Sequence, residues 1–177
     1  MCGIAGILDF GNVSQPREQE LTSMLASIKY RGPDESGIYI GKGIGMGNVR
    51  LSIIDLSAGQ QPIPTADKRY WIVYNGEVFN YIEIRAELEA LGVQFTTHTD
   101  TEVVLYAYAT WGPECLSRFV GQFAIAIWDK QKKELFLARD RMGIRPLFFT
   151  RSDGRFSFCS EIKGLFQLPG VKRSVNH

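Results

Sequence analysis

Cys2 is the residue whose type and position point most directly to chemistry. Because cysteine is small, we expect Met1 to be removed, which would leave a thiol and a free α-amine on the same residue. An α-amine titrates at about pH 7.7–8.0, so it can serve as the general base that activates its own nucleophile. The alternative is a buried cysteine that packs as a small hydrophobic residue at the start of a strand.

A turn at 31–34 can hold two charged side chains, Arg31 and Asp34, in fixed positions. Pro33 restricts the backbone of Gly32 and has no N–H to donate, so this turn is expected to be rigid. An ordinary connection between a helix and a strand, with a solvated ion pair, is the other interpretation.

Two polar sites further along the chain have structural interpretations that the residues alone leave open. Asn75-Gly76 follows a strand of aromatic and β-branched residues, and this dipeptide is a turn signal. A helix is predicted after it instead of a second strand, which argues only weakly against a plain turn. Thr99 or Asp100 can cap the helix that begins there, with Glu102 in the first turn, where negative charge is favoured.

The composition argues against several classes of function. With 20 Lys and Arg against 19 Asp and Glu, the net charge of +1 gives no electrostatic reason to expect nucleic acid or an anionic membrane as a partner. No apolar run approaches the roughly 18–20 residues of a membrane span, and no secretory signal is recognisable. The three cysteines (Cys2, Cys115 and Cys159) cannot all pair with one another, and their wide spacing suggests no metal site. We therefore expect a reduced, cytoplasmic protein.

Helices and hairpin-connected strands share the chain, which predicts an α+β fold with helices on the outer faces of antiparallel sheets. The predicted helices lie at 17–29, 81–91 and 100–111, with a short one from 160. The predicted strands lie at 2–10, 37–41, 44–51, 70–74, 95–99, 121–129, 134–139, 147–150 and 155–159. The first strand matters for function, because an N-terminus tied into a sheet can position a nucleophile.

Six motifs follow one another along nearly the whole chain, at 1–6, 31–34, 50–55, 74–77, 99–102 and 138–146. In this order they resemble the glutaminase domain of class II glutamine amidotransferases, which are N-terminal nucleophile hydrolases. Within that family the chain is most similar to the N-terminal half of glutamine-hydrolysing asparagine synthetases. The resemblance implies a four-layer αββα sandwich of two antiparallel sheets flanked by helices, with residues 1–177 as one glutaminase domain.

The resemblance also implies a role for each residue of the candidate site. Cys2 would attack the side-chain amide of glutamine, while the Asn75 amide and the Gly76 backbone N–H would hold the oxyanion. Arg50 would bind the α-carboxylate through its guanidinium fork, and Asp100 would bind the α-ammonium group. Assistance would come from Glu77 and from the backbone that lines the pocket, at Leu51, Ser52, Ile53 and Ile54.

Two departures from the family pattern bear on the function. Tyr30 stands before Arg31-Gly32, where many asparagine synthetases have histidine and glucosamine-phosphate synthases have tyrosine. Nothing in the chain resembles an ATP-pyrophosphatase loop or a Walker motif. We therefore expect no cofactor and no metal in this domain, and we expect ATP and Mg²⁺ to bind a synthetase domain downstream of it.

Three functions are compatible with the resemblance. The first is a glutaminase that supplies ammonia to a C-terminal synthetase domain, which makes asparagine from aspartate. The second is an amidotransferase domain whose acceptor is a sugar phosphate, a phosphoribosyl donor or a peptide. The third is a catalytically silent regulatory domain, against which Cys2 and Asn75-Gly76 argue. Glutamine is the expected small-molecule partner, and a homodimer is compatible with the family.

Overall fold

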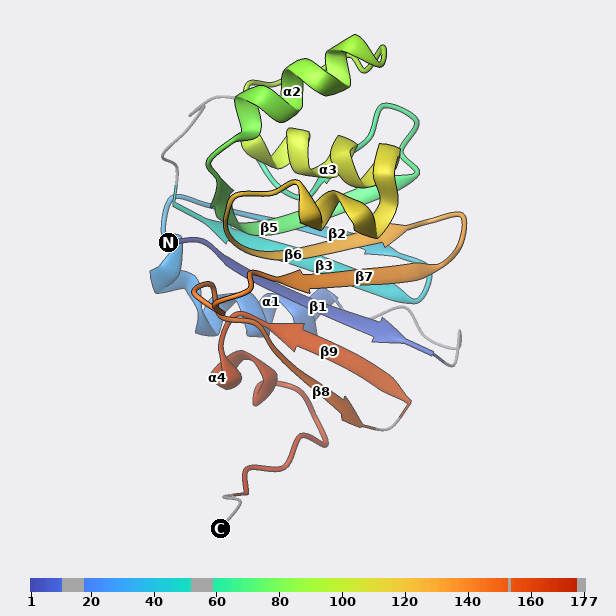
Figure 1. Cartoon of the computed structure of the whole chain (residues 1–177). Helices are drawn as coiled ribbons and strands as arrows, with labels where there is room; N and C mark the ends of the chain where they lie inside the picture. The colour runs from blue at the N-terminus through green and yellow to red at the C-terminus, as the bar shows by residue number, and fades with distance from the viewer. Residues whose placement is uncertain (11–17, 52–58, 153, 175–177) are drawn as a thin grey trace. The chain divides into compact units, whose positions relative to one another are not determined.

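The computed structural model of the chain describes residues 1–10, 18–51, 59–152 and 154–174 (Figure 1). The chain divides into two compact units, of which the first is Met1–Leu51 with Pro146–His177 and the second is Ser52–Arg145. Each unit is built on one antiparallel sheet that packs against helices, as the sequence predicted.

The sheet of the first unit places the N-terminal strand at its centre. Its strands are β1 (Gly3–Asp9), β2 (Glu35–Gly41), β3 (Ile44–Arg50), β8 (Phe148–Ser152) and β9 (Arg155–Cys159), in the order β2-β3-β1-β9-β8. β1 pairs antiparallel with β3 on one side and with β9 on the other. The prediction that a sheet holds the start of the chain is therefore confirmed.

Two α-helices, α1 (Glu18–Ser27) and the short α4 (Ile162–Leu165), pack against this sheet, and the 3-10 helix η1 (Lys29–Arg31) follows α1. The apolar stripe predicted for the first helix is buried at Leu21, Met24 and Leu25. It contacts alternate residues of β1, Ala5 and Ile7, because side chains two apart on a strand share one face.

The second unit has a four-stranded sheet in which β5 and β6 form the long central pair. Its strands are β4 (Ile63–Pro64), β5 (Tyr70–Val78), β6 (Gly121–Asp129) and β7 (Glu134–Arg139), in the order β4-β5-β6-β7. Its helices are α2 (Tyr81–Ala90), α3 (Asp100–Trp111) and the 3-10 helix η2 (Gly112–Ser117). Ile72, Tyr74 and Val78 of β5 pack in one apolar core with Val103 and Val104 of α3.

The turn interpretation of Asn75-Gly76 is wrong, because both residues lie inside strand β5. Asn75 pairs with Ala124 of β6, and Gly76 pairs with Phe123. The two backbones approach closely there: a Cβ atom added at Gly76 would lie 2.4 Å from the carbonyl oxygen of Gln122. The glycine therefore serves a close approach of two strands, which a dipeptide turn rule cannot recognise.

The predicted strand at 95–99 is also absent, and the segment instead leads into the N-terminus of α3. The buried carboxylate of Glu102 accepts hydrogen bonds from the backbone N–H groups of Thr96 and Thr97, at 2.7–3.2 Å, and from their hydroxyls. These donors are then not available to a neighbouring strand. Of the two predicted caps, Thr99 is the one whose side chain accepts the Glu102 N–H, at 3.3 Å.

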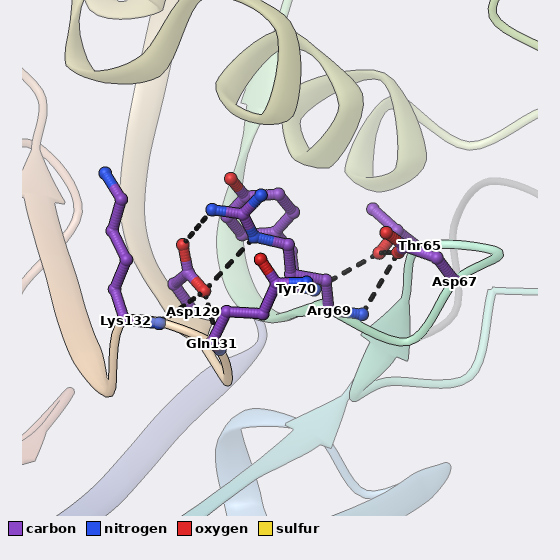
Figure 2. A network of polar contacts seen from close by, with 7 residues as sticks. All are labelled: Thr65, Asp67, Arg69, Tyr70, Asp129, Gln131 and Lys132. Carbon is purple, nitrogen blue, oxygen red and sulfur yellow. Dashed lines mark hydrogen bonds and ion pairs between the residues drawn. The ribbon is translucent and has the colours of Figure 1, made fainter.

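A polar network fixes the first end of β5, near Tyr70 (Figure 2). Arg69 donates two hydrogen bonds to the carboxylate of Asp129, which is paired with Tyr70 in the sheet. The same carboxylate accepts the backbone N–H groups of Gln131 and Lys132 and so closes the turn between β6 and β7.

Within the described residues, no helix is both long and apolar enough for a membrane span. The same part of the chain contains no group of three or more His, Cys, Asp or Glu residues arranged to hold a metal ion.

Candidate functional site

Cys2 lies immediately before β1, beside the end of β3. The pairing of Gly3 with Val49 brings Cys2 next to Arg50 and Leu51, and the thiol is 3.8 Å from the carbonyl oxygen of Leu51. The side chain of Cys2 is half-buried. The first unit thus brings together three of the predicted site residues, which are Cys2, Arg50 and Leu51.

The other two cysteines, Cys115 and Cys159, are buried and differ chemically from Cys2. Burial raises the pKa of the Cys115 thiol to about 12 and that of the Cys159 thiol to about 11. A thiol with such a pKa has almost no thiolate near neutral pH and is a poor nucleophile. Half-buried Cys2 is therefore the best placed of the three to react.

Arg31 anchors the backbone of Cys2. Its Nε atom donates to the carbonyl oxygen of Cys2 at 3.0 Å, and its Nη1 atom pairs with Glu161 at 2.8 Å. Tyr30 donates its hydroxyl to the same carboxylate, and Lys163 lies 3.4 Å from it. Burial alone would raise the pKa of Glu161, but these partners hold that pKa below its usual value.

The sequence predicted a fixed position for Arg31 but not the partners that hold it there. The segment after Arg31 is held against β3, since Asp34 donates its N–H to the carbonyl oxygen of Arg50 at 3.2 Å and Pro33 forms an isolated bridge with Arg50. Gly32 permits this contact, because a Cβ atom there would lie 2.4 Å from the Arg50 nitrogen. Glu161 is 130 positions away from Arg31, so no local pattern could pair them.

Arg50 is held at the end of β3 by an ion pair. Its Nη1 atom lies 2.9 Å from Glu35 Oε2, and its side chain is only 6% exposed. This partner was not foreseen, and it holds the guanidinium against Glu35 of β2, the residue paired with Arg50 in the sheet. The other predicted backbone contributors, Ser52, Ile53 and Ile54, lie outside the described residues.

In the second unit, the edge of β5 that faces away from β6 presents the backbone N–H groups of three alternate residues, Tyr74, Gly76 and Val78. The Tyr74 N–H donates to the side-chain oxygen of Gln61 at 2.7 Å, and the Val78 N–H donates to Asp100 at 3.3 Å. Backbone donors alternate between the two edges of a strand, so the N–H of Gly76 points to the same edge, midway between these two. Its neighbours on that edge are thus satisfied by side chains and not by another strand.

Asn75, next to Gly76, is 1% exposed. Its Nδ2 atom is buried and has no hydrogen-bond partner among the described residues. A buried donor without an acceptor costs roughly 1–3 kcal/mol, so native proteins rarely retain one without a function. The amide nitrogen of Asn75 and the backbone N–H of Gly76 are therefore two adjacent donors suited to an anionic ligand atom.

Asp100, the first residue of α3, contacts the same edge of β5. Its carboxylate accepts the Tyr74 hydroxyl at 2.8 Å as well as the Val78 N–H, and the residue is 6% exposed. Burial raises the pKa of Asp100, an effect that outweighs these donors, and the nearby exposed Glu77 acts in the same direction. No cation among the described residues forms an ion pair with Asp100.

The second unit thus brings Asp100 to the part of β5 that contains Asn75, Gly76 and Glu77. Two further residues of this group, Gln61 and Tyr74, were given no role from the sequence. Tyr74 belongs to the motif at 74–77 but was assigned only to the preceding strand, and Gln61 lies in a long loop without periodicity.

The family model of the glutamine amidotransferase domain matches residues 1–177. The chain therefore belongs to this family. It is similar to curated asparagine synthetases of the glutamine-hydrolysing type. Asparagine synthetase 1 of Bacillus subtilis is 43% identical over 93% of the chain, and asparagine synthetase 3 of the same organism is 39% identical over 99%. The chain spans only 26% and 29% of the lengths of these two relatives.

Solved structures confirm the class II type of fold. The glutamine phosphoribosylpyrophosphate amidotransferase of Bacillus subtilis, complexed with ADP and GMP, has a TM-score of 0.76 at 21% identity. The match covers 93% of this chain and 43% of that one. The allosteric regulatory enzyme of purine biosynthesis gives a TM-score of 0.79, also at 21% identity, over 94% of this chain. At this identity the likeness establishes the fold of two antiparallel sheets with flanking helices.

Proposed function

We propose that the chain hydrolyses the side-chain amide of glutamine to glutamate and ammonia, with Cys2 as the nucleophile. The observation that carries the proposal is the pair of donors on β5. There the buried Asn75 amide nitrogen has no partner among the described residues, and the Gly76 N–H points to the strand edge away from β6. An oxyanion that forms during attack on an amide needs two such donors. Membership of the glutamine amidotransferase family supports the choice of substrate.

The reaction is a hydrolysis in two steps. After removal of Met1, the α-amine of Cys2 takes the thiol proton, and the thiolate attacks the amide carbon of glutamine. The oxyanion accepts hydrogen bonds from Asn75 and Gly76. It then collapses to a thioester as the C–N bond breaks, and the protonated α-amine gives its proton to the leaving NH2 group, which departs as ammonia. Water hydrolyses the thioester, which releases glutamate and restores the thiol.

The amino-acid end of glutamine carries two opposite charges, and two residues match them. Arg50 binds the α-carboxylate, since a guanidinium donates two parallel hydrogen bonds to a carboxylate. Asp100 binds the α-ammonium group, with help from Glu77. The missing cation partner of Asp100 supports this assignment, because a substrate ammonium would supply the positive charge that the described residues lack.

The ammonia serves the formation of asparagine from aspartate. This part of the proposal rests on the curated relatives, which are glutamine-hydrolysing asparagine synthetases and much longer than this chain. An ATP- and Mg²⁺-dependent synthetase domain would be the partner that consumes the ammonia.

The proposal is tested by ammonia release from glutamine and by labelling with an electrophilic glutamine analogue. We expect the parent to be labelled at Cys2, with an intact mass that lacks Met1, and Cys2→Ala to release no ammonia. Cys115→Ala is the matched control, because the buried Cys115 thiol has a pKa of about 12 and should not react. Unchanged ammonia release by Cys2→Ala would refute the mechanism.

A further inference from the structure

Gln61 is a buried amide that joins two elements of the second unit. Its side-chain oxygen accepts the N–H of Tyr74 on β5 at 2.7 Å, and its side-chain nitrogen donates to the hydroxyl of Thr101 on α3 at 3.4 Å. The residue is 7% exposed. Both ends of the amide are therefore used, and both partners belong to elements that carry site residues.

The bond to Tyr74 takes the place of a strand pairing. β4 is only two residues long, and it pairs with Trp71 and Ile72 of β5. Beyond Ile72 this edge of β5 has no partner strand among the described residues, and the amide oxygen of Gln61 satisfies the N–H of Tyr74. A side chain thereby holds the strand edge just before Asn75-Gly76.

The partners of Gln61 are the immediate neighbours of the candidate site residues. Tyr74 precedes Asn75, and Thr101 follows Asp100. The Tyr74 hydroxyl also donates to Asp100 at 2.8 Å, so Gln61, Tyr74 and the start of α3 form a closed ring of contacts. This ring connects the part of β5 next to Asn75-Gly76 with the carboxylate of Asp100, which also accepts the Val78 N–H.

We propose that Gln61 is a positioning residue that sets the spacing between the oxyanion donors and the ammonium acceptor, so that one glutamine engages both. The inference rests on the proposed function and goes beyond it. A substrate that has both an amide and an ammonium group must fit this spacing, whereas one without the ammonium group need only reach the oxyanion donors. Loss of Gln61 should therefore harm glutamine more than an analogue that lacks the α-amino group.

The experiment compares ammonia release from glutamine and from 4-carbamoylbutanoate, which is glutamine without its α-amino group. Gln61→Met keeps the length of the side chain and removes both hydrogen bonds. We expect the ratio of kcat/KM for glutamine to kcat/KM for the analogue to fall about tenfold, the effect of about one net hydrogen bond. Thr101→Val removes only the second bond and should lower the ratio in the same direction by a smaller factor.

Arg69→Met is the control for a loss of stability alone. It removes the ion pair with Asp129 at the other end of β5 and should leave the ratio unchanged. An active parent with an unchanged ratio in both Gln61→Met and Thr101→Val, or an equal fall in Arg69→Met, would overturn the inference alone. A parent that releases no ammonia from glutamine would overturn the proposed function, and the inference with it. If Gln61→Met does not fold, Thr101→Val decides the question.

Discussion

Buried polar side chains lie near both ends of strand β5, but they differ in whether their polar atoms have partners. At the first end, Asp129 is 3% exposed and has a guanidinium and two backbone N–H groups as partners. None of the residues drawn in Figure 2 has a buried side-chain nitrogen or oxygen without a partner. At the second end, the Asn75 amide nitrogen has no partner and Asp100 has no cation, among the residues that the structure describes.

The pKa values of the two carboxyls shift in opposite directions. Burial acts to raise both, but Arg69 and the backbone donors of the turn outweigh it and lower the pKa of Asp129. Burial prevails at Asp100 and raises its pKa, although Tyr74 and Val78 donate to the carboxylate. Two differences account for the opposite shifts: Asp129 lies less deep in the protein than Asp100, and Asp129 has the Arg69 guanidinium as a partner.

This difference distinguishes a carboxylate that serves stability from one that serves binding. A buried charge without a counter-charge is unfavourable, and folded proteins retain such a charge mainly where a ligand completes it. Asp129 already has a counter-charge in Arg69. Asp100 has none among the described residues, and we propose that the ammonium group of glutamine supplies it.

The largest expected effect is that of Asn75→Ala, which removes an unpartnered donor from the second end of β5. Loss of one oxyanion donor typically lowers kcat about 100- to 1,000-fold. Since this donor has no partner in the part of the chain that the structure describes, the free energy of unfolding should not fall by the usual amount for a lost hydrogen bond. Steady-state kinetics and urea unfolding of the same preparation test both statements. A stability loss with normal kcat would make Asn75 a structural residue like Asp129.

Asp100→Asn comes next and keeps the shape of the side chain while it removes the charge. We expect kcat/KM for glutamine to fall roughly 10- to 100-fold, because hydrogen bonds to charged groups contribute about 1.5–3 kcal/mol. At pH 7 the variant should be at least as stable as the parent, since it no longer buries an unpaired carboxylate. A large loss of stability at pH 7 would contradict the comparison.

The raised pKa of Asp100 also predicts how the difference in stability between the parent and Asp100→Asn changes with pH. Below the unfolded pKa of about 3.9, Asp100 is protonated in both states and contributes no pH dependence. As the pH rises from there through the raised folded pKa, only the folded state still holds the proton, so the parent loses stability relative to Asp100→Asn. Urea unfolding at several pH values measures this difference, which should grow as pH rises and then become constant.

Asp129→Asn should behave in the opposite way and cost about 2 kcal/mol of stability at pH 7, through loss of charge-assisted bonds to Arg69. Because its folded pKa is lowered, this stabilisation is complete above about pH 3.9 and disappears as the pH falls through the folded pKa. The kcat/KM for glutamine should stay within about twofold of the parent, in keeping with a change remote from the site. A selective rise in KM would show that the two ends of β5 are coupled.

Much of the fold could be predicted because its signals are local. The helical spacing of the first helix, the apolar run that forms the N-terminal strand and the Thr99 cap all depend on residues close together in sequence. The errors arose where a local signal was overridden by a distant partner. Asn75-Gly76 is a turn signal, yet the full pairing of β5 with β6 keeps it in a strand.

The candidate site shows the same division. Cys2, Asn75 and Asp100 were proposed from their motifs, whereas the residues that contact them in the structure were not. Gln61 and Tyr74 are 13 positions apart, and Arg31 and Glu161 are 130 apart, so these contacts exist only once the sheets have formed. Sequence patterns thus identify groups that could react, and tertiary structure decides which residues hold them.

Tyr74→Phe is the smallest change and the sharpest test of the second end of β5. Tyr74 packs in the apolar core of the second unit, and its hydroxyl donates to Asp100 at 2.8 Å. Burial, together with the charge of Asp100, keeps the pKa of Tyr74 well above its usual value, so the hydroxyl remains a donor at neutral pH. Without it, Asp100 keeps the Val78 N–H and should bind an ammonium group less well. We expect the KM for glutamine to rise about fivefold, close to 1 kcal/mol, with little change in kcat.

Tyr70→Phe supplies the matched control for that variant, because Tyr70 lies at the first end of the same strand, paired with Asp129 in the sheet. Its hydroxyl is not part of the candidate site, so its loss should alter stability slightly and leave the KM for glutamine unchanged. Equal effects of the two variants on KM would mean that the hydroxyl of Tyr74 acts only through the general packing of the sheet. A rise in the KM for glutamine that is confined to Tyr74→Phe would instead show that a donor from β5 orients the Asp100 carboxylate. Tyr74→Phe removes that single donor, whereas Tyr70→Phe leaves the hydrogen bonds of Asp100 intact.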